Sequence, residues 1–184
     1  MEISHKERLI KDMLSVCSLS SDELSDASRM EFIDKAISWH YTDRDECGRT
    51  AKIKGCPYWT KAALERFLSG QEKHRDGDYR HEHIIPRIIF KEAIFNGLFK
   101  NYTTNELKDI FDRNLIGCVV TQDEDSLLNE YKSSMPGDES EKDFFSIADP
   151  WARYKAVGLT KICKVEWKHS GNGWKYVSHT LMTL

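Results

Sequence analysis

The chain has 184 residues, of which 40% are apolar and 11% aromatic, as is typical of one globular domain with a substantial core. Its formal net charge of −3 argues against a protein that coats nucleic acid by bulk electrostatic attraction. No apolar stretch approaches the ~20 residues that a membrane-spanning helix needs, and the charged first residues lead into no apolar signal-peptide core. We therefore expect a single-domain cytoplasmic protein with no membrane contact.

The N-terminal part, residues 1–70, is predicted to be mostly helical. Apolar residues recur at helical spacing over 5–17, and Ser28 opens a capping-box pattern that predicts a second helix reaching about Trp39. Thr60 is a suitable N-cap for a short third helix over 61–68. These patterns predict helices that pack through their apolar faces.

The rest of the chain alternates short strands with helices. For residues 71–135 the patterns predict a strand over 79–86, a helix over 87–98, a helix capped by Thr103, a strand over 115–121 and a helix over about 123–133. For residues 136–184 they predict a short helix after Asp149 and a hairpin with strands over 159–168 and 174–182. The predicted fold class is α+β, mostly helical, in a single domain.

The run from Arg80 to Pro86 (Arg-His-Glu-His-Ile-Ile-Pro) concentrates titratable side chains beside an apolar anchor. Strand alternation places His81 and His83 on one face and Glu82 on the other. A bend in the strand would direct Glu82 and His83 toward one site. Because no other segment combines such groups, we predict that the functional site lies here.

The segment 82–86 (Glu-His-Ile-Ile-Pro) resembles the D/E-H-I/V-I/V-P signature of HNH nucleases, the ββα-metal class. The similarity extends over roughly residues 58–133. Such nucleases have a signature strand, a loop with an asparagine, a second strand and a helix that supplies the last metal ligand. In this chain Asn114 directly precedes the second predicted strand, and the helix after that strand opens with three carboxylates, Asp123, Glu124 and Asp125.

The resemblance implies a metal-dependent endonuclease that hydrolyses phosphodiester bonds. His83 would be the general base, Asn114 would orient it, and His81 is a further catalytic candidate as its neighbour on the strand. Glu82 would bind Mg²⁺ or Mn²⁺ together with one carboxylate from Asp123, Glu124 or Asp125.

The same resemblance implies nucleic acid as the partner, with DNA favoured over RNA. Arg80 and Arg87 flank the motif and would bind phosphates, although surface ion pairs would explain both residues equally well. The implied setting is bacterial or phage, in defence or in a mobile element. A homodimer is expected only because two-fold dimers are common among small oligomeric proteins.

A second interpretation stays open, in which the chain keeps a similar fold but has lost the metal. It would then bind a protein or nucleic acid, for example as an inhibitor in phage–host conflict. The acidic total charge favours it, as does the separation of His83 and Asn114, which are 31 positions apart where the family has a short loop. The final predicted helix also lacks the usual His or Asn at the ligand position. The intact Glu82-His83 pair favours the enzyme.

The five cysteines include no Cys-x-x-Cys pair, and we expect reduced thiols. Cys47, Cys56 and His40 could together form part of a zinc site. We do not expect structural zinc, because four-ligand zinc sites usually contain at least one closely spaced pair of ligands.

Overall fold

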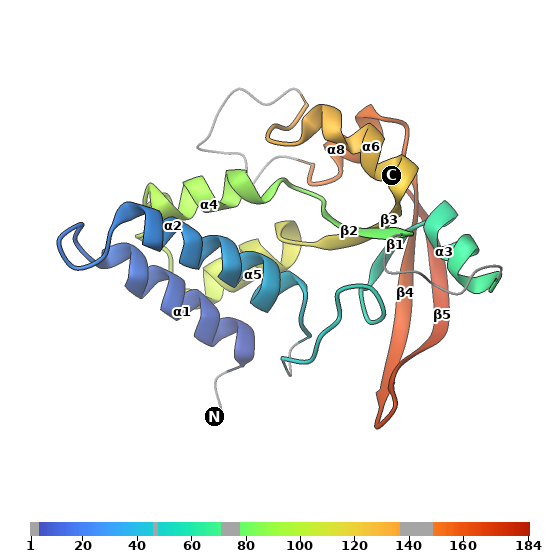
Figure 1. Ribbon diagram of the computed structural model, residues 1–184, viewed down its shortest axis with the longest axis horizontal. Coiled ribbons are helices and arrows are strands. Elements are labelled where there is room, and N and C mark those ends of the chain that lie inside the picture. The colour runs from blue at the N-terminus through green and yellow to red at the C-terminus, as the bar shows by residue number, and fades with distance from the viewer. Residues whose placement is uncertain (1–3, 46–47, 71–77, 137–148) are drawn as a thin grey trace.

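The structure, a computed structural model, describes residues 4–45, 48–70, 78–136 and 149–184. It has the α+β architecture that the sequence predicts (Figure 1). Four helices lie together at one end: α1 (His5–Ser18), α2 (Asp26–Lys35), α4 (Arg87–Phe95) and α5 (Thr104–Asn114). The other end holds the strands β1 (Tyr58–Thr60), β2 (Tyr79–His83), β3 (Gly117–Thr121), β4 (Lys161–Ser170) and β5 (Gly173–Thr183), with α3 (Lys61–Leu68), α6 (Gln122–Leu128) and α8 (Ala152–Ala156) around them.

The start of α2 differs from the prediction. Ser25, rather than Ser28, is the N-cap, and its Oγ accepts a hydrogen bond of 3.3 Å from the backbone N–H of Ser28. The earlier start places the carboxylate of Asp26 in the first helical turn, where the helix dipole favours a negative charge. At its end, α2 continues into a π-helical turn, η1 (Ala36–Thr42), which carries the helical path past the predicted end at Trp39.

The predicted caps Thr60 and Thr103 are confirmed, whereas the short helix predicted after Asp149 begins later, with Trp151 rather than Asp149 at the N-cap of α8. The hydroxyl of Thr60 accepts from the backbone of Ala63 at the start of α3, and Thr103 forms a complete capping box with Glu106 at the start of α5. Near the C-terminus the predicted hairpin is present, but its turn is tighter than expected, at residues 171–172. Within the described ranges, no helix is long and apolar enough to cross a membrane.

The five strands form one sheet in the order β2-β3-β1-β4-β5. β1 and β3 are parallel, and the other neighbours are antiparallel. The sequence analysis did not predict β1, because three residues are too few to show alternation; its Trp59 is fully buried in the centre of the sheet. β2 is an edge strand, so its end is open to residues from other elements.

A strand–strand–helix unit carries the motif. β2 pairs with β3 so that His83 lies opposite Gly117, and α6 begins directly after β3 and contacts both strands. Helices α4 and α5 are inserted between the two strands and join the helical end of the molecule. The separation of His83 and Asn114, which are 31 positions apart, is thus accommodated as an insertion of two helices, which leaves the strand pair intact.

Gly117 is a glycine because His81 packs against it. A Cβ atom at position 117 would overlap the imidazole Nε2 and Cε1 of His81, whose side chain is enclosed on all sides. We expect Gly117→Ala to lower the free energy of unfolding by about 1–3 kcal/mol, as overpacked core positions do. Urea unfolding would measure it. Gly171→Ala, in the hairpin turn with open space around it, is the matched control, and an equal effect of both substitutions would contradict this account.

Candidate functional site

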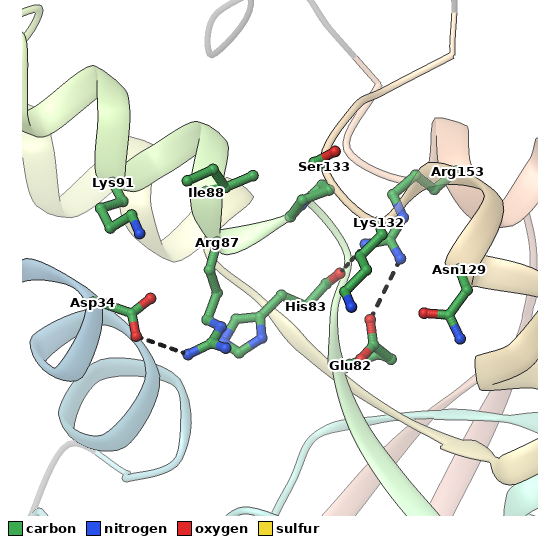
Figure 2. A pocket seen from close by; sticks show the side chains of 11 residues that line it. Asp34, Glu82, His83, Arg87, Ile88, Lys91, Asn129, Lys132, Ser133 and Arg153 are labelled. Atoms are coloured by element: carbon green, nitrogen blue, oxygen red, sulfur yellow. Dashed lines mark hydrogen bonds and ion pairs between the residues drawn. The ribbon is translucent and has the colours of Figure 1, made fainter. Parts of the chain in front are cut away.

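The end of β2 opens onto a pocket of about 370 Å³. Strand β2 forms one wall and α4 another, while α2, α8 and the segment after α6 close the remaining sides (Figure 2). Its charged and polar lining residues are Asp34, Glu82, His83, Arg87, Lys91, Asn129, Lys132, Ser133 and Arg153. Glu82 and His83 both line this pocket, and their side chains keep the predicted alternation: they lie on opposite sides of β2 (Figure 2), and the His83 ring contacts that of His81.

His83 is buried, with 8% of its surface exposed. Burial lowers its pKa well below the usual 6.5, because a charged imidazolium would lose its hydration, and the positive charges of His81, Arg87 and Arg153 lower it further. The imidazole is therefore neutral at physiological pH. A neutral imidazole at a pocket wall can accept a proton from a bound water or hydroxyl group.

Glu82 lies among both signs of charge. Burial raises the pKa of its carboxyl group, the guanidinium of Arg153 opposes this shift, and the carboxylate of Asp125 adds to it through both charge and a hydrogen bond. The Arg153 guanidinium lies 3.4 Å from Glu82 Oε2. Glu82 and Asp125 thus form a closely interacting acidic pair that spans β2 and α6.

The three predicted metal-binding carboxylates of α6 have different surroundings. Asp125 interacts with Glu82, and the Nε of Arg80 lies 4.0 Å from its Oδ2. Glu124 closes the capping box of α6 and accepts a 2.6 Å hydrogen bond from the Thr60 hydroxyl. Asp123 is exposed in the first helical turn. None of the three lines the pocket, and of them Asp125 is the one that interacts with Glu82.

Arg153 is a site residue that the sequence analysis missed. It is buried, with 2% of its surface exposed, and it donates to the backbone oxygens of His83 (3.0 Å) and Leu128 (3.2 Å) as well as to Glu82. One guanidinium therefore joins α8 to the end of β2 and the end of α6. In the sequence, the one available signal was the excess of bases after residue 149, and this does not distinguish Arg153 from the exposed lysines around it.

The two arginines that flank the motif are separated. Arg87 lines the pocket, and its guanidinium lies 3.3 Å from the Asp34 carboxylate. Arg80 points toward Asp125, on the side of β2 covered by α6. Asn114, at the end of α5, is buried; its side-chain amide donates to the Ile110 carbonyl, and it is not among the residues that line the pocket. Its role in orienting His83 stays a prediction.

His81 lies on the same face of β2 as His83, and the two imidazole rings meet edge to face with their centroids 5.4 Å apart. The Nδ1 of His81 lies 3.0 Å from Asp43 Oδ1, and its side chain is 1% exposed and does not line the pocket. Burial by itself lowers the pKa of His81, but hydrogen bonds to Asp43 and Cys56 and the charge of the Asp43 carboxylate outweigh it and raise the pKa to about 9. His81 is therefore charged at neutral pH, and this charge helps to keep His83 neutral. A direct catalytic role for His81 stays a prediction.

The raised pKa of His81 makes stability depend on pH. The folded-state pKa of about 9 exceeds the usual 6.5, so protonated His81 stabilises the folded state. This contribution to the free energy of unfolding is complete below about pH 6.5 and is lost as the pH rises through 9. We expect the free energy of unfolding to fall by about 2 kcal/mol between pH 7 and pH 9.5. Urea unfolding at both pH values would measure this. Asp43→Asn should make the free energy of unfolding less dependent on pH. An unchanged pH dependence in that variant would contradict the raised pKa of His81 as its cause.

The cysteines and acidic groups that the structure describes form no ready-made metal site. Cys17, Cys56, Cys118 and Cys163 are free thiols. In the part of the chain that the structure describes, no three His, Cys, Asp or Glu side chains form a ready-made metal-binding group. The suggested zinc ligand Cys47 and the side chain of His40 lie outside what the structure describes, so that interpretation stays untested.

Comparisons with known proteins add no relative: no family model, no curated protein and no solved structure matches the chain. The HNH-like interpretation therefore depends on the segment 82–86 and on the packing of β2, β3 and α6.

Proposed function

We propose that the protein is a divalent-metal-dependent, HNH-like endonuclease that hydrolyses phosphodiester bonds in nucleic acid. One observation carries the proposal: adjacent Glu82 and His83 line a single pocket, while Asp125 of α6 interacts with Glu82. A strand pair followed by a helix, with the histidine at the end of the first strand and carboxylates on both elements, is the arrangement that the sequence resemblance implies.

The acidic pair fits a hard divalent cation. Two carboxylates held together in a partly buried place repel one another, and a bound Mg²⁺ or Mn²⁺ would relieve this repulsion through its preferred oxygen ligands. Glu82 and Asp125 are the residues that would hold the ion. When bound, the ion would supply Lewis-acid stabilisation of the charge that develops on the scissile phosphate.

The chain's own residues supply the remaining functions. His83, neutral and enclosed, would take the proton of the attacking water. Arg87 would contact a phosphate from the opposite wall, while its ion pair with Asp34 holds the guanidinium in place. Arg153 fixes the main chain at His83 through its hydrogen bond to that carbonyl, so it would act as a positioning residue.

The wider setting belongs to the same proposal. DNA is favoured over RNA, the expected location is the cytoplasm, and a two-fold dimer would suit a nuclease that cuts both strands of a duplex. A bacterial or phage defence role, or one in a mobile element, follows from the family resemblance alone.

Metal binding and cleavage test the proposal together. We expect Mn²⁺ or Mg²⁺ to raise the Tm of the natural chain, and we expect Asp125→Asn to abolish most of this rise and to lower cleavage of plasmid, single-stranded DNA or RNA by at least tenfold. Asp123→Asn, which makes the same change at an exposed position of the same helix, is the control and should behave like the natural chain. EDTA should stop cleavage. If neither the natural chain nor any variant cleaves nucleic acid, and no metal ion raises the Tm, the proposal of a metal-dependent nuclease is refuted.

A metal-free binding protein is the second candidate, and the Glu82–Arg153 ion pair favours it. The guanidinium already provides Glu82 with a buried positive partner, as in a site where a resident cation has replaced a metal. This candidate predicts that nucleic acid or a protein partner binds equally well in EDTA and is not cleaved. The assay above separates the two, because a metal-dependent rise in Tm is expected for the enzyme alone.

A further inference from the structure

The pocket has an excess of positive charge. Of the residues that the structure describes, four cationic side chains line it, Arg87, Lys91, Lys132 and Arg153, against two carboxylates, Asp34 and Glu82. Each carboxylate already pairs with one arginine: Asp34 with Arg87 at 3.3 Å and Glu82 with Arg153 at 3.4 Å.

Lys91 and Lys132 are not neutralised in this way. Neither lysine makes an ion pair with any residue that the structure describes, and they come from different walls, α4 and the segment after α6 (Figure 2). The pocket therefore offers two uncompensated positive charges to a ligand. Since charges in a partly enclosed site are screened less than charges on an open surface, an anion gains more here than at isolated surface lysines.

The neutral part of the lining suits a phosphate rather than a base. Asn129 and Ser133 add hydrogen-bonding groups, and Pro86 and Ile88 supply the apolar part of the lining. Among the lining residues that the structure describes there is no aromatic side chain, so this part of the lining offers no ring on which a nucleobase would stack. Its volume of about 370 Å³ is at the small end of the usual range for ligand pockets, which is enough for one phosphate with its sugar but not for a duplex.

We propose that this pocket binds the terminal phosphomonoester of a nucleic-acid strand. A phosphomonoester carries a charge of about −1.5 to −2 at neutral pH, which matches the two uncompensated lysines, whereas an internal phosphodiester carries one negative charge and would leave one lysine unbalanced. The inference rests on the proposed nuclease function and adds a preferred substrate to it: a strand with a phosphorylated end, whose terminal phosphate is held in the pocket that Glu82 and His83 line. Either the 5′ or the 3′ end of a strand supplies this group.

Binding in EDTA tests the pocket without requiring catalysis. Single-stranded DNA hexamers with a 5′-phosphate, a 3′-phosphate or neither would be titrated against the full chain, with inorganic phosphate as competitor. We expect at least one phosphorylated hexamer to bind tenfold or more tightly than the unphosphorylated one, and phosphate to displace it. Lys91→Gln and Lys132→Gln should each remove most of this preference. Lys164→Gln, the same change at an exposed position of β4, should keep it.

Equal affinity for all three hexamers would overturn the inference. So would a loss of the preference for phosphorylated hexamers in Lys164→Gln as large as the loss in Lys91→Gln and Lys132→Gln. A cleavage assay with Mg²⁺ or Mn²⁺ on circular and on phosphorylated linear single strands separates this failure from failure of the nuclease. Equal cleavage of both would overturn end recognition and leave the nuclease standing. Preferential binding of phosphorylated ends with no cleavage of any substrate would refute the nuclease and retain the phosphomonoester site.

Discussion

Replacing His83 by alanine should lower the rate of phosphodiester cleavage by about 10²–10⁴-fold, the usual effect of removing a general base. The expectation follows from the state and the position of the imidazole: burial and four neighbouring positive charges keep it neutral, and His83 lines the pocket together with Glu82. A neutral imidazole can take a proton from water without first losing one of its own. The measurement is the single-turnover rate of cleavage of labelled DNA in Mg²⁺ or Mn²⁺.

Two controls distinguish lost chemistry from lost structure. His179→Ala removes an imidazole from an exposed position of β5 and should leave the rate unchanged. Free imidazole should restore part of the activity of His83→Ala, since the small base can occupy the space that the side chain leaves, whereas a misfolded variant would not respond. A His83→Ala protein that folds normally and cleaves at the natural rate would exclude His83 as the base.

The local parts of this site follow from the sequence because their causes are local. Thr60 and Thr103 cap helices through hydrogen bonds to residues three positions away, and such patterns are visible in any stretch of chain. The strand character and the apolar anchor of segment 82–86 are equally local. The capping residue of α2 was predicted wrongly, because Ser25 and Ser28 are both suitable N-cap residues and the local pattern does not decide between them.

The convergence of the site depends on packing between distant segments. Glu124 and Asp125 are adjacent in the sequence and both acidic, yet a distant hydroxyl, that of Thr60, binds Glu124, while Asp125 interacts with Glu82. Which of the two carboxylates approaches Glu82 follows from how α6 lies on β2, and no pattern within the helix shows it. The same holds for Gly117, whose lack of a side chain has a reason only once His81 is placed against it.

Arg153 is the clearest case of a residue whose role arises from the tertiary structure, and it gives the largest expected effect on stability. We expect Arg153→Met to lower the free energy of unfolding by about 3–5 kcal/mol, the usual effect of breaking a buried ion pair from one side. The substitution would leave the partly buried carboxylate of Glu82 without its cation and would leave the carbonyls of His83 and Leu128 without this donor. Arg153→Lys should also destabilise, because a compact ammonium group cannot match the planar fork that reaches three acceptors. Urea unfolding at pH 7 measures both.

A double-mutant cycle with Glu82→Gln separates the charge of Arg153 from its packing. If the unpaired carboxylate dominates, Arg153→Met combined with Glu82→Gln should be more stable than Arg153→Met alone, because the amide needs no counter-charge. Lys155→Met, at an exposed position of the same helix, is the control and should change stability by less than about 1 kcal/mol. A loss below that value for Arg153→Met would show that the guanidinium does not hold β2, α6 and α8 together. The positions of Glu82 and His83 would then depend on the strand pairing of the sheet alone. The Glu82–Arg153 ion pair would also no longer favour the metal-free binding protein over the nuclease.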